Sequence, residues 1–131
     1  MSQITTHVLY TSTGLPAAGM SVRLEKPIAV RDSNESAIGI SDHKMIDDTL
    51  WETIAIGKTD NGGRVSKLLK EGEILNPGTY RLVFESGNYF LNQGVIGFYP
   101  LVILVFETLD TKHYHVPLLL SPYGYSTYRG S

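Results

Sequence analysis

The chain of 131 residues contains no cysteine, which excludes disulfide bonds and thiolate chemistry. It also lacks a charge excess of either sign, because the formal net charge is -2 and the basic residues are scattered along the sequence. A nucleic-acid-binding protein or a polybasic membrane anchor would instead concentrate lysine and arginine in one patch. We therefore expect no nucleic-acid partner and no membrane partner.

Long hydrophobic runs are missing as well. The longest apolar run, residues 100–106, is far shorter than the ~20 residues of a membrane-spanning helix. The first ten residues lack the basic and apolar regions of a signal peptide. These absences predict a cytoplasmic location. A peroxisomal location is the alternative, although the closing Arg-Gly-Ser differs from the S-K-L signal.

Helical periodicity is scarce, and apolar and polar residues mostly alternate. Met20, Val22 and Leu24 share one face of a predicted strand, for example. The predicted strands include residues 4–11, 20–26, 51–59, 78–86, 101–106 and 112–121. A short helix is predicted within residues 86–94. Six to eight short strands in a chain that is 42% hydrophobic indicate an all-β sandwich, in one domain of residues 1–131.

Three segments depart from the simple alternating pattern. Residues 27–50 form a long, mostly polar connection, which we expect to be a solvated surface insertion with a helical turn capped by Ser41. Pro117 interrupts the last long strand, and since proline cannot donate to a sheet ladder, that strand is expected at an edge or with a local bulge. The strand at residues 101–106 is apolar on both faces and is expected to be covered on both. A leucine-rich edge strand also needs cover, so an oligomer is predicted.

Familiar catalytic motifs are absent, including G-x-S-x-G, the P-loop, H-E-x-x-H and G-x-G-x-x-G. The remaining candidates are His7, Arg64, His113 and His115, together with Tyr128, Arg129 and Ser131 at the end of the sequence. The structural alternatives are a hydrogen-bonded core histidine, a solvated charge after a turn, and a serine with no base beside it. The three histidines could also bind a metal ion, but their spacing matches no ligand signature. Composition and spacing alone therefore favour structural roles.

A resemblance changes this balance. The last nineteen residues, "HYHVPLLLSPYGYSTYRGS", resemble the C-terminal signature of the 5-hydroxyisourate hydrolases, transthyretin-related enzymes of purine degradation. "TTHVLYTSTGLPAAGMSVRLE", "WETIAIGKTDNGGR" and "LNPGTYRLVFESGNYF" resemble further parts of that family. The closing Tyr-Arg-Gly-Ser is the specific part, because the transthyretin hormone carriers share the layout but end differently.

The resemblance implies a transthyretin-like β-sandwich of about eight strands with one short helix. It implies a homotetramer, a dimer of dimers, with active sites in a channel where the dimers meet. The implied reaction opens the cyclic amide of 5-hydroxyisourate by hydrolysis, giving 2-oxo-4-hydroxy-4-carboxy-5-ureidoimidazoline. The substrate would be this small molecule, and the reaction would need no metal and no organic cofactor. The alternative is a non-enzymatic carrier of small ligands in the same channel, as in transthyretin; a secreted structural sandwich is disfavoured by the missing signal peptide.

The family's site residues fall on His7, Arg64, His115 and residues 128–131 of this chain. Because histidine suits the role of a base near neutral pH, we assign His115 as the general base, with His7 sharing the proton relay or holding the substrate. Arg64 would bind carbonyl oxygens and the developing oxyanion. Tyr128 would pack against the ring or hydrogen-bond to it, and Ser131 would hydrogen-bond the water or the substrate.

Three features differ from the family pattern. Tyr10 stands where an acidic or amide residue is usual, and an additional glycine precedes Arg64. The insertion at residues 27–50 is also longer than usual.

Overall fold

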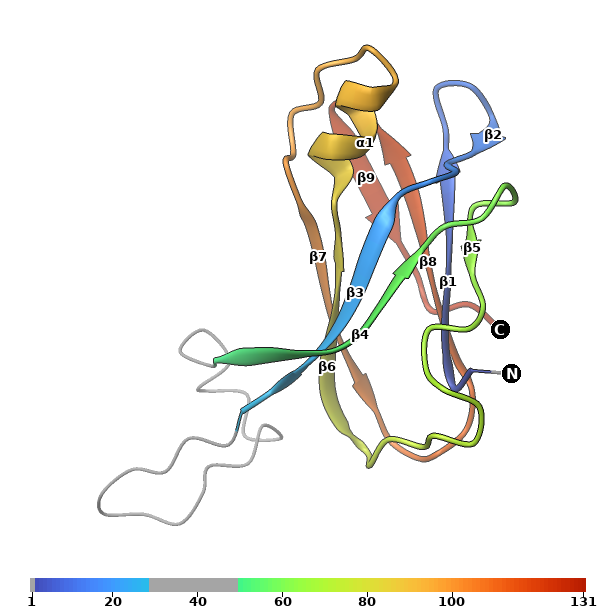
Figure 1. The fold of residues 1–131 in the computed structure, drawn as a ribbon, viewed down its shortest axis with the longest axis vertical. Helices are drawn as coiled ribbons and strands as arrows, with labels where there is room; N and C mark the ends of the chain where they lie inside the picture. Colours follow the sequence, from blue (N-terminus) through green and yellow to red (C-terminus); the bar gives the residue numbers. More distant parts are fainter. Residues whose placement is uncertain (1, 29–49) are drawn as a thin grey trace.

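The computed structural model describes residues 2–28 and 50–131 (Figure 1). The helical turn expected at Ser41 and most of the expected insertion at residues 27–50 lie outside the described residues. Within the described parts, no helix is long and apolar enough to cross a membrane. The cytoplasmic location stays a prediction.

Two sheets pack face to face, as predicted for a sandwich (Figure 1). The first sheet contains β1 (Ile4–Tyr10), β2 (Leu15–Pro16), β5 (Arg64–Val65), β8 (Tyr114–Ser121) and β9 (Gly124–Thr127). Its order is β2-β1-β8-β9, and β5 also pairs with β1. The second sheet contains β4 (Trp51–Lys58), β3 (Ser21–Pro27), β6 (Gly78–Phe84) and β7 (Val102–Thr108), in that order. The strands β1 and β8 run parallel, and the other recorded pairs are antiparallel.

The core lies between the sheets and is built from the inward residues of the alternating strands. In the second sheet, Leu24, Leu82 and Leu104 form one row across three strands. The facing side chains of the first sheet include Ile4, Val8, Leu118 and Leu120, all of them at most 1% exposed. The predicted alternation is therefore confirmed on these strands, and it leaves the opposite side chains of the first sheet outside the core.

The predicted short helix is confirmed as α1 (Ser86–Asn92). Its buried Tyr89 and Phe90 make edge-to-face contacts with Tyr10, with ring centroids 5.9 and 5.7 Å from the Tyr10 ring. These contacts hold the helix against the end of β1 and place the Tyr10 ring in the core.

The expected edge position of the Pro117 strand is wrong, because β8 lies between β1 and β9. The Gly130 N–H donates to the carbonyl of His115 on the β9 side, and Pro117, two residues along, turns its backbone to the same side. The regular ladder is interrupted there: β9 ends at Thr127, and pairing resumes only at the isolated bridge between His115 and Gly130. An inner strand thus accommodates proline where its partner strand lacks a ladder pair.

The expectation that β7 is covered on both faces is not met within one chain. Val102 and Leu104 point into the core, whereas Ile103 and Val105 on the other face are 41% and 47% exposed. In the described part of the chain, β7 forms one edge of its sheet, opposite β4, and β9 forms one edge of the other sheet, opposite β2.

Candidate active site

The outer face of the first sheet brings together three of the site residues named from the sequence. Strand pairing places Arg64 of β5 directly opposite His7 of β1. On the other side of β1, Thr5 lies opposite His115 of β8. Because residues two apart share a face of a strand, His7 and Thr5 lie on one surface with Arg64 and His115.

The turn before Arg64 explains how the additional glycine is accommodated. The Asp60 carboxylate accepts hydrogen bonds from the N–H groups of Gly62 (2.9 Å) and Arg64 (3.0 Å). Gly63 adopts a φ of 75°, and a Cβ at this position would lie 2.5 Å from the Val8 carbonyl oxygen. A glycine is needed there on both counts. The Gly63 carbonyl in turn accepts from the Val8 N–H (2.7 Å), which fixes the turn to β1 beside His7.

His115 is half-buried and is tied to β1 through a side chain. The hydroxyl oxygen of Thr5 lies 2.8 Å from Nδ1 of His115 and 2.8 Å from Nε2 of His113. The two imidazole rings lie with centroids 6.4 Å apart and an interplanar angle of 20°. The hydroxyl thus bridges two histidines that are neighbours on one strand face.

The surroundings of His115 lower its pKa below the usual 6.5. Burial is the largest cause, followed by the positive charges of His113, Arg64 and His7. A hydrogen bond with the Thr5 backbone acts in the opposite direction. The net shift favours a neutral imidazole near pH 7, and a neutral imidazole is the form that can accept a proton.

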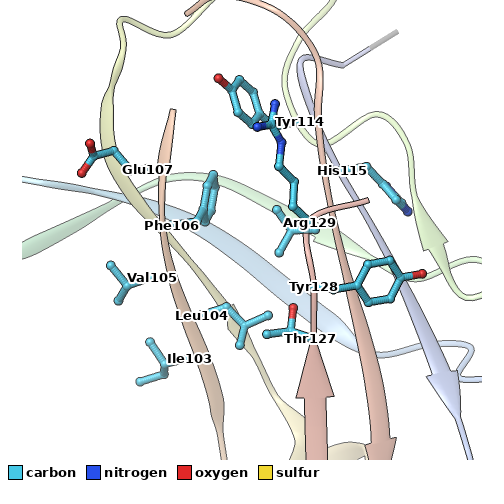
Figure 2. A pocket seen from close by; sticks show the side chains of 11 residues that line it. Ile103, Leu104, Val105, Phe106, Glu107, Tyr114, His115, Thr127, Tyr128 and Arg129 are labelled. Carbon is cyan, nitrogen blue, oxygen red and sulfur yellow. The ribbon is translucent and has the colours of Figure 1, made fainter. Parts of the chain in front are cut away.

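The C-terminal residues lie directly against His115. A Cβ built on Gly130 would lie 2.5 Å from Cδ2 of His115, so only a glycine fits this close to the ring. Figure 2 shows Tyr128 and His115 on the same side of the strands, with Arg129 turned the other way. Ser131, the next residue after Gly130, is exposed. The resemblance-based residues Tyr128 and Ser131 therefore belong to the segment that contacts His115.

Arg129, which the sequence reasoning left without a role, anchors this segment to the core. Its guanidinium carbon lies 4.7 Å from the centroid of the Tyr114 ring, within the range of a cation–π contact. The Tyr114 hydroxyl donates to Asp110 (3.0 Å) and accepts from the Leu109 N–H (2.9 Å). The alternation of side chains along residues 128–130 was the available signal, since it predicts that Arg129 points away from Tyr128.

A cavity of about 470 Å³ opens between β7 and the C-terminal segment (Figure 2). Ile103, Leu104, Val105, Phe106 and Glu107 line one side, and Tyr114, His115, Val116, Thr127, Tyr128 and Arg129 line the other. His115 and Tyr128 are the two site candidates that border it.

Two other sequence-based expectations concern this region. Tyr10, the unusual residue near His7, lies in the core on the opposite face of β1 and does not contact the candidate site. In residues 2–28 and 50–131, no group of three or more histidine, cysteine, aspartate or glutamate side chains is placed to hold a metal ion.

Comparisons with known proteins identify the family of the chain. The family model described as HIUase/Transthyretin family matches residues 4–130. A 5-hydroxyisourate hydrolase of Mus musculus is 40% identical over 131 residues, covering 99% of this chain and 96% of that protein. 5-Hydroxyisourate hydrolase 2 of Rhizobium meliloti is 41% identical over 134 residues, covering 98% and 96%.

Two solved structures share the fold of this chain. The 5-hydroxyisourate hydrolase of Klebsiella pneumoniae superposes with a TM-score of 0.71 at 31% identity, covering 98% of both chains. Transthyretin from Sparus aurata superposes with a TM-score of 0.78 at 26% identity, covering 99% of this chain and 97% of that one. The predicted all-β transthyretin-like sandwich with one short helix is therefore confirmed.

Proposed function

The chain belongs to the HIUase/Transthyretin family, and we propose that within it this protein is a 5-hydroxyisourate hydrolase. The observation that carries the proposal is the outer face of the first sheet, where His7, Arg64 and His115 are brought together by strand pairing. Imidazole and guanidinium groups suit proton transfer and binding of a developing oxyanion. A carrier of apolar ligands would be better served by aliphatic and hydroxyl groups. The full-length identity of about 40% to named hydrolases supports the enzyme over the carrier.

The reaction opens a cyclic amide by attack of water on its carbonyl carbon. In our mechanism His115, kept neutral by its surroundings, takes a proton from that water as the water attacks. The carbonyl oxygen becomes an oxyanion, which Arg64 stabilises by its fixed positive charge and its N–H donors. Collapse of this intermediate breaks the ring C–N bond, and the departing nitrogen takes up the proton from His115 to complete the opening.

The other site residues would bind rather than transform the substrate. His7, opposite Arg64, would hold the substrate or share the proton with His115. Tyr128 would pack against or hydrogen-bond the ring, and Ser131 would hydrogen-bond the water or the substrate. These assignments rest on the resemblance and on the position of the C-terminal segment against His115.

We also propose that the protein is a homotetramer, a dimer of dimers with the active sites in the channel between dimers. Two features support association. The strands β7 and β9 are free edges in the described part of the chain, and the outer face of β7 presents the half-exposed Ile103 and Val105. Unpaired, apolar strand edges are usually covered by another chain in a soluble protein.

The test of the enzyme is the ultraviolet decay of freshly prepared 5-hydroxyisourate, compared with its spontaneous decay. The full chain should accelerate the decay, whereas His115→Ala and a chain ending at Thr127 should not, while their thermal unfolding stays cooperative. Lys112→Ala, an exposed residue in the turn before β8, serves as the control and should retain activity. A full chain that does not exceed the spontaneous rate, but that binds thyroxine in equilibrium dialysis, would replace the enzyme with the carrier.

A further inference from the structure

The hydroxyl group of Thr5 occupies an unusual position between two imidazole rings. Its oxygen lies 2.8 Å from Nδ1 of His115 and 2.8 Å from Nε2 of His113. Thr5 is buried, so the hydroxyl depends on these partners for its hydrogen bonds. The neighbouring Thr6 shows the common alternative, because its buried hydroxyl donates to the backbone carbonyl of Val116.

The shared hydroxyl group couples the protonation of the two rings. A hydroxyl group carries one proton, so it can donate to only one of the two ring nitrogens. The other ring nitrogen must then carry a proton and donate to the hydroxyl oxygen. When both rings are neutral, only two arrangements satisfy both hydrogen bonds, and each fixes the tautomer of both histidines.

The proposed reaction selects one of the two arrangements. Nδ1 of His115 is bound to Thr5, so Nε2 is the nitrogen left to accept a proton from water. For Nε2 to be free of a proton, Nδ1 must carry it and donate to Thr5. The Thr5 hydroxyl then donates to Nε2 of His113. The Thr5 backbone also hydrogen-bonds His115 and raises its pKa, as a group that accepts from the protonated ring does.

We propose that Thr5 is a positioning residue that holds His115 with its proton on Nδ1, and that Nε2 of His113 accepts the hydrogen bond of the Thr5 hydroxyl. These three residues form a hydrogen-bond chain, His115–Thr5–His113. The inference rests on the proposed hydrolase function for its catalytic consequence. It adds Thr5 and His113 to the residues that prepare the general base. When His115 takes the proton of water on Nε2, the new positive charge is stabilised by the Thr5 oxygen, and no other bond of Thr5 or His113 changes.

His113 is exposed, and it faces the solvent rather than the core. The charged or titratable groups around the hydrogen-bond chain are His7 on β1 and Arg64 on β5. Glu107 of β7 and Tyr128 of the C-terminal segment line the adjoining cavity. Arg64 and His7 act on the charge of His115, whereas the Thr5 side chain hydrogen-bonds its ring.

The test compares Thr5→Val, which removes the hydroxyl at nearly constant shape, with Thr6→Val, the same change one residue along on the core face. Thr5→Val should lower kcat/KM by about 10–100-fold and shift the acid limb of its pH profile. Thr5→Ser should restore both. Thr6→Val should leave kcat/KM and the profile unchanged even where it lowers the melting temperature. A Thr5→Val enzyme with the wild-type kcat/KM and profile would overturn the inference.

A double-mutant cycle tests the coupling to His113. If the hydroxyl works through His113, the losses in kcat/KM of Thr5→Val and His113→Leu should not multiply in the double variant. Fully multiplicative losses would show two independent contributions and would reject the proposed hydrogen-bond chain from His115 through Thr5 to His113.

Imidazole ¹⁵N spectra of the unliganded protein give a readout that needs no substrate. In the wild type, Nδ1 of His115 should show the shift of a protonated ring nitrogen and Nε2 that of an unprotonated one. In Thr5→Val the two tautomers should mix. A wild-type protein protonated on Nε2 instead would refute the assignment directly. If the full chain failed to hydrolyse 5-hydroxyisourate while these spectra held, the function would be wrong and the tautomer assignment right.

Discussion

The contact between Gly130 and His115 predicts that one methyl group in the C-terminal segment reduces catalysis without unfolding the protein. A Cβ at position 130 would lie 2.5 Å from Cδ2 of His115, whereas ordinary van der Waals contact begins at 3.4 Å. Gly130→Ala must therefore displace the imidazole or the C-terminal segment by about 0.9 Å. The backbone of Gly130 is not in the left-handed region, so the effect of alanine is steric.

The size of the loss follows from this displacement. A shift of about 1 Å in a catalytic group typically costs about 10²-fold in rate, because the reacting atoms lose their alignment. That factor corresponds to about 2.7 kcal/mol of transition-state stabilisation. The free energy of unfolding should change by at most ~0.5 kcal/mol, since the segment is at the surface, and the melting temperature by about 2 °C.

The assay is kcat/KM for 5-hydroxyisourate beside a thermal unfolding curve for each variant. Gly124→Ala is the matched control, because a Cβ there has its nearest neighbour at 3.7 Å, the Ser121 hydroxyl. It makes the same substitution in the same C-terminal region and should retain activity. Full activity in Gly130→Ala would refute the argument that this segment sets the position of His115.

Three further predictions concern charge and assembly. Arg64→Met should lower kcat/KM by about 10²–10³-fold. It should also move the acid limb of the pH profile to higher pH, because Arg64 helps to lower the pKa of His115. Arg64→Lys should keep the limb in place, and an unmoved limb in Arg64→Met would contradict this cause. Glu25→Gln should lower the free energy of unfolding by about 1.5–3 kcal/mol at pH 7, because the carboxylate accepts hydrogen bonds from Arg81 (2.6 Å) and Arg23 (3.0 Å). Although burial raises the pKa of Glu25, these hydrogen bonds and that of Thr53 lower it below 4.5. The stabilisation is therefore present above pH 4.5 and is lost as the pH falls through the folded-state pKa. Thermal unfolding of both proteins at pH 7 and pH 3 checks this, and an equal difference in stability at the two pH values would contradict it. Val105→Lys should reduce the mass in sedimentation equilibrium from that of four chains, and an unchanged tetramer would show that this face of β7 lies outside the interfaces.

The strands and their inward faces were predictable from the sequence because alternation is a local property. Met20, Val22 and Leu24 lie in the core as the pattern indicates, and α1 lies within residues 86–94, where a short helix was predicted. Burial of every second residue leaves a period of two that needs no knowledge of the partner strand.

The order of strands was not predictable in this way. From the sequence, Pro117 was expected at an edge or at a local bulge; the edge position is wrong, because β8 pairs in parallel with β1, more than a hundred residues away. Which strand lies beside which depends on contacts between distant parts of the chain. Proline excludes a ladder hydrogen bond on one side only, and here that side faces the interruption between Thr127 and Gly130.

The candidate site shows the same division between local and distant information. The sequence identified His113 and His115 as neighbours on a strand face, and from the sequence alone a metal pair was one alternative. The register of β1 against β8 places the Thr5 hydroxyl between them, at hydrogen-bonding distance from both. Alternation places Thr5 and Thr6 on opposite faces of β1, but no local pattern shows which distant groups their hydroxyls meet: two imidazole rings for Thr5 and a backbone carbonyl for Thr6.

This arrangement separates stability from chemistry on one strand. The side chains of Val116, Leu118 and Leu120 face inward and bury apolar area, which stabilises the sandwich whatever the outer face carries. The side chains of His113 and His115 alternate with them on the outer face and add little apolar burial. Substitutions on the outer face can therefore change the chemistry while the core stays intact, so proteins with different names, the 5-hydroxyisourate hydrolase of Klebsiella pneumoniae and the transthyretin of Sparus aurata, can share this fold. It is also why the activity of His115, Thr5 and Gly130 variants can be measured in folded protein.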